Sequence, residues 1–229
     1  MATNKKLIVS GVLFGYGIES NGPIPNSDTR STTTVDIEKA KVLLEKAKVK
    51  DLAFSIATAD SPDLKQAAEI IKNEWEKIGA NVTIKVFEYG DLYQNIITTR
   101  KYDALLFGES ISKDIDLYAF WHSSQRNPPG LNVSMYVNSK VDKLLEDAKK
   151  TPNEKDRENI YSQFERIIQD EVPAVFLYSP EFIYVIPEKL QGFNLGDITS
   201  PADRFYGVNK WYVTTDNVWR IFNKENNNK

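Results

Sequence analysis

The sequence has no cysteine and only one histidine, His122, and these absences exclude several kinds of chemistry. Without cysteine the chain can form no disulfide, no zinc–thiolate site and no thiol nucleophile. One histidine cannot build a multi-histidine metal site within a single chain. The sequence also lacks the Gly-x-Ser-x-Gly elbow of serine hydrolases and the Gly-x-x-x-x-Gly-Lys loop that binds phosphates. We therefore expect no resident metal or other cofactor, and no enzymatic activity.

Neither a strong charge of one sign nor a long apolar run is present. The 229 residues include 29 Lys+Arg and 32 Asp+Glu, which gives a formal net charge of −3. This balance lacks the basic excess of nucleic-acid-binding proteins, so nucleic acid is not an expected partner. The apolar, glycine-containing residues 7–17 are too few for a membrane span and lack the layout of a signal peptide. Read literally, this start indicates a cytosolic protein; alternatively, the sequence begins inside a longer one.

The composition is that of a folded protein, with 41% hydrophobic and 27% charged residues. Residues 1–35 form an N-terminal segment that ends in a linker rich in Gly, Pro, Ser and Thr. Residues 36–190 carry alternating helix and strand patterns, which predict one α/β lobe. Residues 191–229 are rich in loops and aromatic side chains, and we expect this C-terminal extension to end in disordered residues.

Helix and strand patterns alternate along the lobe. Apolar residues at helical spacing predict helices at residues 36–47, 61–79, 92–99, 139–149 and 153–170. Alternating or continuous apolar runs predict strands at residues 52–56, 82–86, 104–107, 175–178 and 182–186. Between residues 52 and 108 the order is strand–helix–strand–helix–strand, which predicts parallel strands with right-handed crossovers. We therefore expect an α/β fold with a parallel or mixed sheet flanked by helices.

Open parallel sheets bind ligands outside the carboxyl ends of their strands, where the strand order reverses. This rule selects the loops at residues 58–61, 88–91 and 108–116. The last loop supplies carboxylates and hydroxyls, and an aromatic run follows it: Glu109, Ser110, Ser112, Asp114, Asp116, Tyr118, Phe120, Trp121 and His122. Aromatic walls with a few polar groups are typical of small-molecule sites. The alternatives are a solvated acidic loop, aromatic residues that belong to the core, and a structural histidine.

Several short motifs occur together in a characteristic order along nearly the whole chain. They are Gly22-Pro23-Ile24-Pro25, Ala40-Lys41-Val42-Leu43-Leu44, Trp75 followed by Gly79 and Val82, Tyr102-Asp103, and Val172-Pro173-Ala174. In this order and spacing they resemble the C-terminal lobe of bacterial family 5 extracellular solute-binding proteins, the peptide and nickel receptors of ABC importers. The resemblance implies a type II periplasmic-binding-protein lobe, with residues 191–229 as a strand-rich extension that returns toward the other lobe.

The resemblance also implies location and partners. These receptors have two lobes that close on a ligand through a hinge, and most of the other lobe precedes this segment. They are exported and often lipid-anchored, so the parent protein is expected outside the cytoplasm. Its expected partners are a peptide or other small solute, the missing N-terminal lobe and the permease subunits of the transporter. A lobe without its partner would expose apolar surface, so self-association of the isolated chain is also expected.

Site residues transfer from the family only in part. In the peptide receptors the loop after the third strand carries an Asp that holds the ligand's α-ammonium; Ser112 takes that position here, and Glu109 replaces a Trp. A neutral serine cannot form the charge-assisted bond that an ammonium needs. Either Glu109 supplies the charge, or the ligand is not an ordinary free-amino peptide. Tyr89 matches a Trp that lines a side-chain pocket. With one histidine, nickel would have to arrive chelated.

The sequence thus predicts a ligand-binding wall made of Tyr89, Phe107, Glu109, Ser110 and Ser112, with Trp121 and His122 beside it. Two rival interpretations stay open at this point. The same lobe can serve as the effector sensor of a transcriptional regulator. Alternatively, the chain is a free-standing α/β hydrolase that uses Asp114 or Asp116 with His122.

Overall fold

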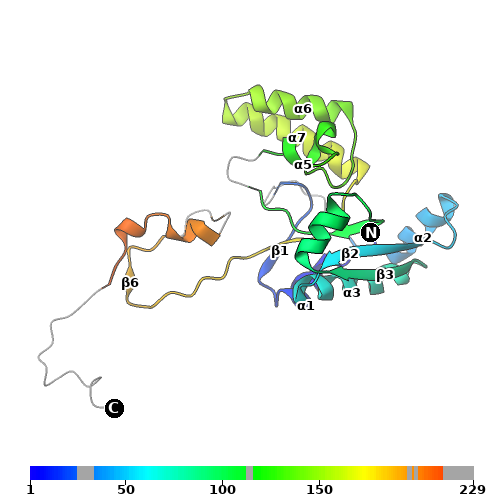
Figure 1. The fold of residues 1–229 in the computed structure, drawn as a ribbon, viewed down its shortest axis with the longest axis horizontal. Coiled ribbons are helices and arrows are strands. Elements are labelled where there is room, and N and C mark those ends of the chain that lie inside the picture. Colours follow the sequence, from blue (N-terminus) through cyan, green and yellow to red (C-terminus); the bar gives the residue numbers. More distant parts are fainter. Residues whose placement is uncertain (25–33, 112–115, 195–197, 199–200, 214–229) are drawn as a thin grey trace, which may run out of the picture. The chain divides into compact units, whose positions relative to one another are not determined.

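The computed structural model describes residues 1–24, 34–111, 116–194, 198 and 201–213 (Figure 1). The chain divides into two compact units, Met1–Glu181 and Phe182–Lys229. Among the residues described, no helix combines the length and apolar character needed to cross a membrane.

A parallel sheet forms the centre of the larger unit (Figure 1). Its strands are β2 (Ala53–Ala59), β3 (Asn81–Phe87) and β4 (Ala104–Leu106), in the order β3-β2-β4. Both neighbours run parallel to β2. The three predicted strands and their parallel direction are therefore confirmed.

The connections between these strands are helical, as the periodicity predicts. Helix α3 (Pro62–Glu76) joins β2 to β3. Ser61 occupies its N-cap position and proline its first turn, but the Ser61 side chain makes no capping hydrogen bond. The short α4 (Tyr89–Asp91) continues into the π-helical turn η1 (Leu92–Ile97) and leads to β4. Gly79, with φ +90°, ends the α3 segment in a conformation that favours glycine.

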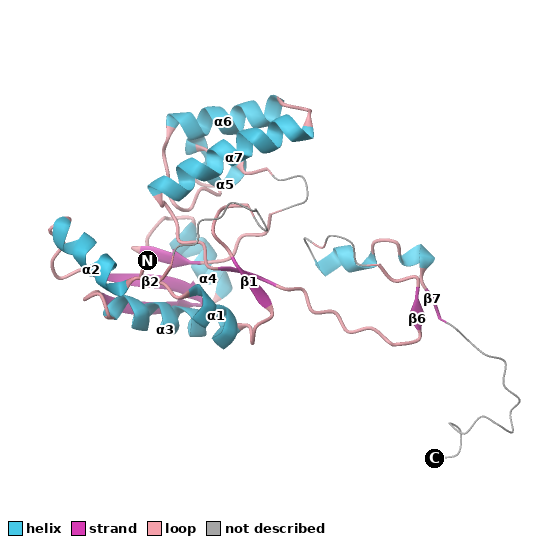
Figure 2. Ribbon diagram, turned by 180° about the vertical axis from the view of Figure 1, so that it is seen from behind, coloured by secondary structure: helices cyan, strands magenta, loops and turns pink. Residues whose placement is uncertain are grey.

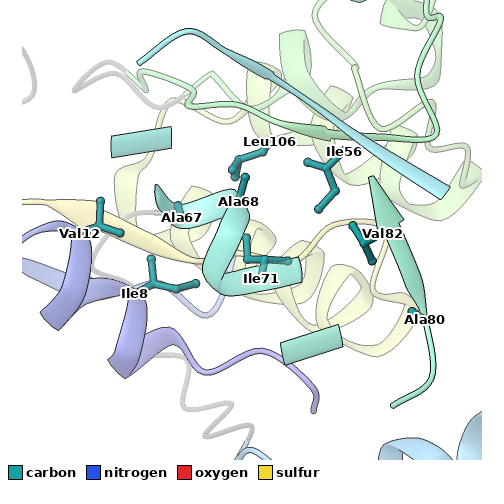
Figure 3. Close-up of a cluster of buried hydrophobic side chains, with 9 residues drawn as sticks. All are labelled: Ile8, Val12, Ile56, Ala67, Ala68, Ile71, Ala80, Val82 and Leu106. Carbon is teal, nitrogen blue, oxygen red and sulfur yellow. The ribbon is translucent and has the colours of Figure 1, made fainter. Parts of the chain in front are cut away.

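Helices cover one face of the sheet and the η1 turn covers the other. Helix α1 (Lys5–Val12) packs beside α3 in a core of buried residues that Figure 3 shows: Ile8, Val12, Ile56, Ala67, Ala68, Ile71, Ala80, Val82 and Leu106. Ala67 and Ala68 are fully buried, and their small side chains allow α3 to lie close to the strands. On the opposite face, Leu105 packs against a smaller cluster: Ala57, Ala59, Leu92 and Ile97. Strand β4 is thus covered on both faces, as its unbroken apolar run predicts.

Helix α2 (Ile37–Lys46) precedes the sheet and begins where the sequence predicts. The Asp36 side chain caps it by accepting a hydrogen bond from the Lys39 backbone N–H at 2.8 Å. A capping carboxylate satisfies one of the free N–H groups at a helix start.

Three further helices form a second core in the same unit (Figure 2). They are α5 (Tyr118–Trp121), α6 (Ser139–Lys150) and α7 (Glu154–Glu171), with the 3-10 turn η2 (Ser123–Gln125) after α5. The buried residues of this helical core are Leu117, Trp121, Val141, Leu145, Ala148, Tyr161, Phe164 and Ile168. The predicted helices at 139–149 and 153–170 agree with α6 and α7 within one or two residues.

The strands predicted after α7 are wrong. Strand β1 (Gly17–Glu19) pairs antiparallel with β5 (Tyr178–Pro180), so only Tyr178 of the predicted strand 175–178 lies in a strand. Residues 182–186 form none, and Ile183 and Val185 are 63% and 87% exposed. A strand needs a neighbour to satisfy its backbone hydrogen bonds, and the pairing with the short β1 ends at Pro180.

The smaller unit is described in parts. Strands β6 (Leu190–Gln191) and β7 (Tyr212–Val213) pair antiparallel, and the 3-10 turns η3 (Pro201–Phe205) and η4 (Val208–Lys210) lie between them in sequence. Its aromatic rings pack on one another, with 5.1 Å between the centroids of Phe193 and Trp211. The C-terminal residues expected to be disordered lie outside the described residues.

Candidate functional site

The strand order reverses at the carboxyl edge of the sheet, next to β2. The chain leaves β2 for β3 on one side and enters β4 on the other. Thr58 pairs with Leu106 in the sheet, and its buried hydroxyl donates to the Leu106 carbonyl at 3.1 Å. On the other side, the Asp60 N–H donates to the Phe87 carbonyl at 2.7 Å. The ends of all three strands therefore meet at one edge, where the sequence places the ligand loops.

Two aromatic residues stand exposed at this edge. Phe107, directly after β4, is 43% exposed, and Tyr89, at the start of α4, is 57% exposed. Gly108 follows Phe107 with no atom within 4 Å of the position that a Cβ would take. Neither aromatic residue belongs to the buried clusters, so both have surface free for a ligand.

Glu109 and Ser110 come next and are exposed as well. Although Glu109 reaches solvent, the surrounding protein removes enough of its hydration to raise the pKa of its carboxyl to about 7. It has no ion-pair partner among the residues that the structure describes. By contrast, Asp60 pairs with Lys65 at 2.5 Å. A cation placed beside Glu109 would favour its charged form. Ser112 and Asp114 lie outside the described residues.

Trp121 lies in the helical core. Its side chain is 5% exposed and packs against three aromatic rings, with centroid distances of 6.3 Å to Tyr136, 6.1 Å to Phe164 and 5.9 Å to Phe176. Its Nε1 has no hydrogen-bond acceptor in the described part of the chain. This position leaves Trp121 little surface with which to touch a solute.

His122 is 7% exposed and links α5 to α6. Its Nδ1 accepts a hydrogen bond from the Ser124 N–H at 3.1 Å and lies 2.8 Å from the Ser124 hydroxyl oxygen. These bonds assign the ring proton to Nε2, which lies 3.5 Å from a Glu146 carboxylate oxygen and 3.9 Å from one of Asp142. The contact with Ser124 caps the turn η2.

The hydrolase hypothesis named Asp116 as a partner of His122, and the structure places this carboxylate elsewhere. Asp116 accepts a hydrogen bond from the Tyr118 N–H at 3.1 Å and pairs with Lys149 at 3.3 Å. Among described residues, no cluster of three or more His, Asp or Glu side chains could hold a metal ion.

Sequence reasoning missed Asn132, which is fully buried. Its Nδ2 donates to the carbonyls of Trp121 at 3.3 Å, His122 at 3.2 Å and Tyr136 at 3.0 Å. Its Oδ1 accepts from the Tyr136 N–H and from the Ser134 hydroxyl. The Asn132-Val133-Ser134 triplet matches the glycosylation pattern. In the structure, however, the Asn132 side chain is buried and its hydrogen bonds hold together the segment of chain that follows α5.

Arg100 connects this segment to the sheet. Its guanidinium donates to the carbonyls of Arg126 at 3.1 Å, Ile97 at 2.7 Å and Gly130 at 2.7 Å. The Tyr102 hydroxyl donates to the Val133 carbonyl at 2.5 Å. Cavities of about 510 and 320 Å³ also occur in the larger unit, and neither is lined by a candidate site residue.

Comparison with known proteins identifies the family. The model of the middle part of bacterial extracellular solute-binding proteins, family 5, matches residues 1–130. The chain belongs to this family.

Individual relatives match over most of the chain. The oligopeptide-binding protein AppA of Bacillus subtilis is 29% identical over 236 residues, which cover 93% of this chain and 42% of that protein. The solved structure of AppA with a nonapeptide has a TM-score of 0.76 and 27% identity, and covers 93% of this chain and 46% of that one. NikZ from Campylobacter jejuni, solved with Ni(L-His), has a TM-score of 0.73 and 26% identity, with coverages of 92% and 46%. The chain thus spans less than half the length of these relatives, and its fold is that of a type II periplasmic-binding-protein lobe.

Proposed function

We propose that this chain is the ligand-binding lobe of a substrate-binding component of an ABC importer, which captures short peptides or a similar small solute between two lobes. The observation that carries the proposal is the exposed edge at the strand reversal. There Phe107 and Tyr89 supply aromatic surface on either side of β2, and Glu109 supplies a carboxylate. Membership of the solute-binding family and the relatives' ligands support it.

The wall that we propose consists of Tyr89, Phe107, Glu109, Ser110 and Ser112. The aromatic rings would pack on apolar parts of the solute, the serines would bond its polar groups, and Glu109 would bind a cationic group. Loss of hydration disfavours the charged form of Glu109, and a cationic group of the solute would favour that form again. Trp121 and His122 would support this wall from the helical core.

A second lobe and a transporter are the partners that this function requires. The site residues are exposed at an open edge, so a facing surface would have to complete the pocket. Near β1, Phe14, Tyr16 and Ile18 are 83%, 56% and 52% exposed, and such apolar surface suits the other lobe or a second copy of the isolated chain. The parent receptor would work outside the cytoplasm, together with permease subunits, and by binding and not by turnover.

Calorimetric titration of the full-length receptor tests the proposal. The ligands would be N-acetylated di- to pentapeptides in matched neutral and lysine-containing sets, so that only the second set carries a cationic group. We expect both sets to bind to the wild type. Glu109→Gln should lower the affinity for the lysine-containing ligands about fivefold or more and leave the affinity for the neutral ones unchanged. Glu45→Gln, which removes the same charge on exposed α2, is the matched control. The Glu109 role is wrong if affinity for the lysine-containing ligands stays within about twofold.

A further inference from the structure

The chain that follows the proposed wall rests on the helical core on both sides of residues 112–115. Before them, Ile111 packs against that core, directly after Glu109 and Ser110. After them, Leu117 is fully buried within it. The position of the wall therefore depends on how firmly this part of the chain is attached to the helices α5, α6 and α7.

Lys149, near the end of α6, makes an attachment of this kind. Its Nζ lies 3.3 Å from one carboxylate oxygen of Asp116. The other oxygen of Asp116 accepts the Tyr118 N–H at 3.1 Å, at the start of α5. The same Nζ lies 4.1 Å from the centroid of the Tyr118 ring, a distance that suits a cation–π contact. One ammonium group thus holds both Asp116 and Tyr118 against α6.

The Tyr118 ring makes a second contact as well. The ring of His122 stacks on it, with 4.1 Å between centroids and 17° between planes. Lys149 and His122 therefore both contact the Tyr118 ring, the first from α6 and the second from the position that follows α5. These two contacts restrict the motion of Tyr118.

We propose that Lys149 is a positioning residue for the ligand wall. It does not touch the solute; it fixes Asp116 and Tyr118 on α6, beside the helical core on which Ile111 also packs, and so limits the motion of the neighbouring Glu109 and Ser110. This inference rests on the proposed function, because it assumes that residues 107–110 line the cleft. It adds a residue on a distant helix to those that determine affinity.

The size of the effect has an upper limit. The contacts of Lys149 can favour the positioned form of the wall by no more than their own free energy. This free energy is therefore also the largest amount of binding free energy that their loss can remove. Both contacts of Lys149 are half-exposed, and an exposed ion pair and an exposed cation–π contact are each weak. Loss of both should weaken binding by about three- to tenfold.

The test uses the full-length receptor and a matched pair of lysines. Lys149→Met removes the anchor. Lys150→Met removes the same charge one residue later, where the lysine is 74% exposed and lies 3.9 Å from Glu146. Lys149→Arg keeps a cation that can both pair with Asp116 and stack on Tyr118. Lysine-containing tripeptides are the binding probe, and hydrogen exchange of the amides at residues 107–111 and 116–118 is measured without ligand.

Lys149→Met should speed hydrogen exchange of these amides and raise the Kd about three- to tenfold. Lys150→Met should leave the exchange rates and the Kd at their wild-type values. Lys149→Arg should also keep both close to wild type. Equal thermal unfolding of the two Met variants would exclude a general loss of stability. The inference is overturned if exchange stays at the wild-type rate in Lys149→Met, or if Lys150→Met has the same effects. If the wild type binds no peptide, the proposed function fails, and the exchange rates still decide whether Lys149 holds the wall.

Discussion

Asp103 uses a single carboxylate oxygen to accept two hydrogen bonds from Ser55, one from its backbone N–H at 2.9 Å and one from its hydroxyl at 2.7 Å. Ser55 is buried within β2, and Asp103 directly precedes β4. The pair therefore aligns β4 with β2 at the end of the sheet opposite the candidate site. Both hydrogen bonds favour the charged carboxylate and hold the pKa of Asp103 below its usual value.

This pKa shift predicts acid sensitivity. A carboxyl group whose pKa is lower in the folded state adds stability above its unfolded pKa and loses that contribution as the pH falls. Asp103→Asn keeps an acceptor oxygen but cannot titrate. Urea unfolding from neutral pH down to about pH 3 should show the wild type more stable than the variant at neutral pH, with the difference shrinking in acid. A difference that does not change with pH would contradict this assignment.

Replacement of Asn132 should destabilise the chain strongly. Asn132→Ala would leave the buried Trp121 carbonyl without its side-chain donor and the Tyr136 N–H without its acceptor. We expect a loss of about 3 kcal/mol in the free energy of unfolding, because unsatisfied buried polar groups are costly. Denaturant unfolding measures it, with exposed Asn159→Ala on α7 as the control. Equal losses in both variants would show that the Asn132 hydrogen bonds contribute little.

The contribution of Glu109 to the free energy of unfolding should depend on pH in the opposite direction to that of Asp103. Its pKa is raised from 4.5 to about 7, so the folded protein resists ionisation of this group and loses stability as the pH rises through that interval. Glu109→Gln should match the wild type in acid and exceed it in stability above about pH 7. Unfolding curves of both proteins across this range provide the measurement. Parallel curves would mean that Glu109 is as well hydrated as in the unfolded chain.

Replacement of Phe107 should weaken ligand binding without affecting the stability of the fold. Its ring is 43% exposed, so Phe107→Ala removes little buried surface and should leave the unfolding temperature nearly unchanged. Under the proposed function, the same change should weaken peptide binding by about tenfold in the full-length receptor. Calorimetry with the tightest-binding peptide measures it, with Tyr206→Ala, an 82% exposed aromatic residue of the smaller unit, as control. Unchanged affinity would remove Phe107 from the wall.

The sheet and its main helices were predictable because local patterns and tertiary structure agree there. Apolar residues alternate with others at 52–56 and 82–86, and Pro62 and Gly79 mark the ends of the segment that contains α3. These signals lie within a few residues of the elements that they define. The candidate ligand edge was predicted from the order of helices and strands along the chain, and its role in binding stays a prediction.

The predictions that failed, and the role of Asn132 that was missed, depend on contacts between distant parts of the chain. Residues 182–186 have strand composition, but β1, the partner of the preceding β5, lies more than a hundred positions away and spans only three residues. Trp121 follows the ligand loop in sequence, yet its ring turns into the helical core and packs on Phe164 from α7. The role of Asn132 depends on three carbonyls that only the folded chain brings together. No local pattern contains that information.

The three hydrogen bonds of Arg100 bear on how the protein responds to ionic strength. All of them end on backbone carbonyls, so within the described chain the guanidinium is held by dipoles and not by an opposite charge. Dissolved salt weakens the attraction between exposed ions much more than it weakens short, partly buried hydrogen bonds. Concentrated salt should therefore weaken the pair between Asp116 and Lys149 while the hydrogen bond from Arg100 to Gly130 persists. The chain around α5 would then lose one polar contact at its start and keep those at its end.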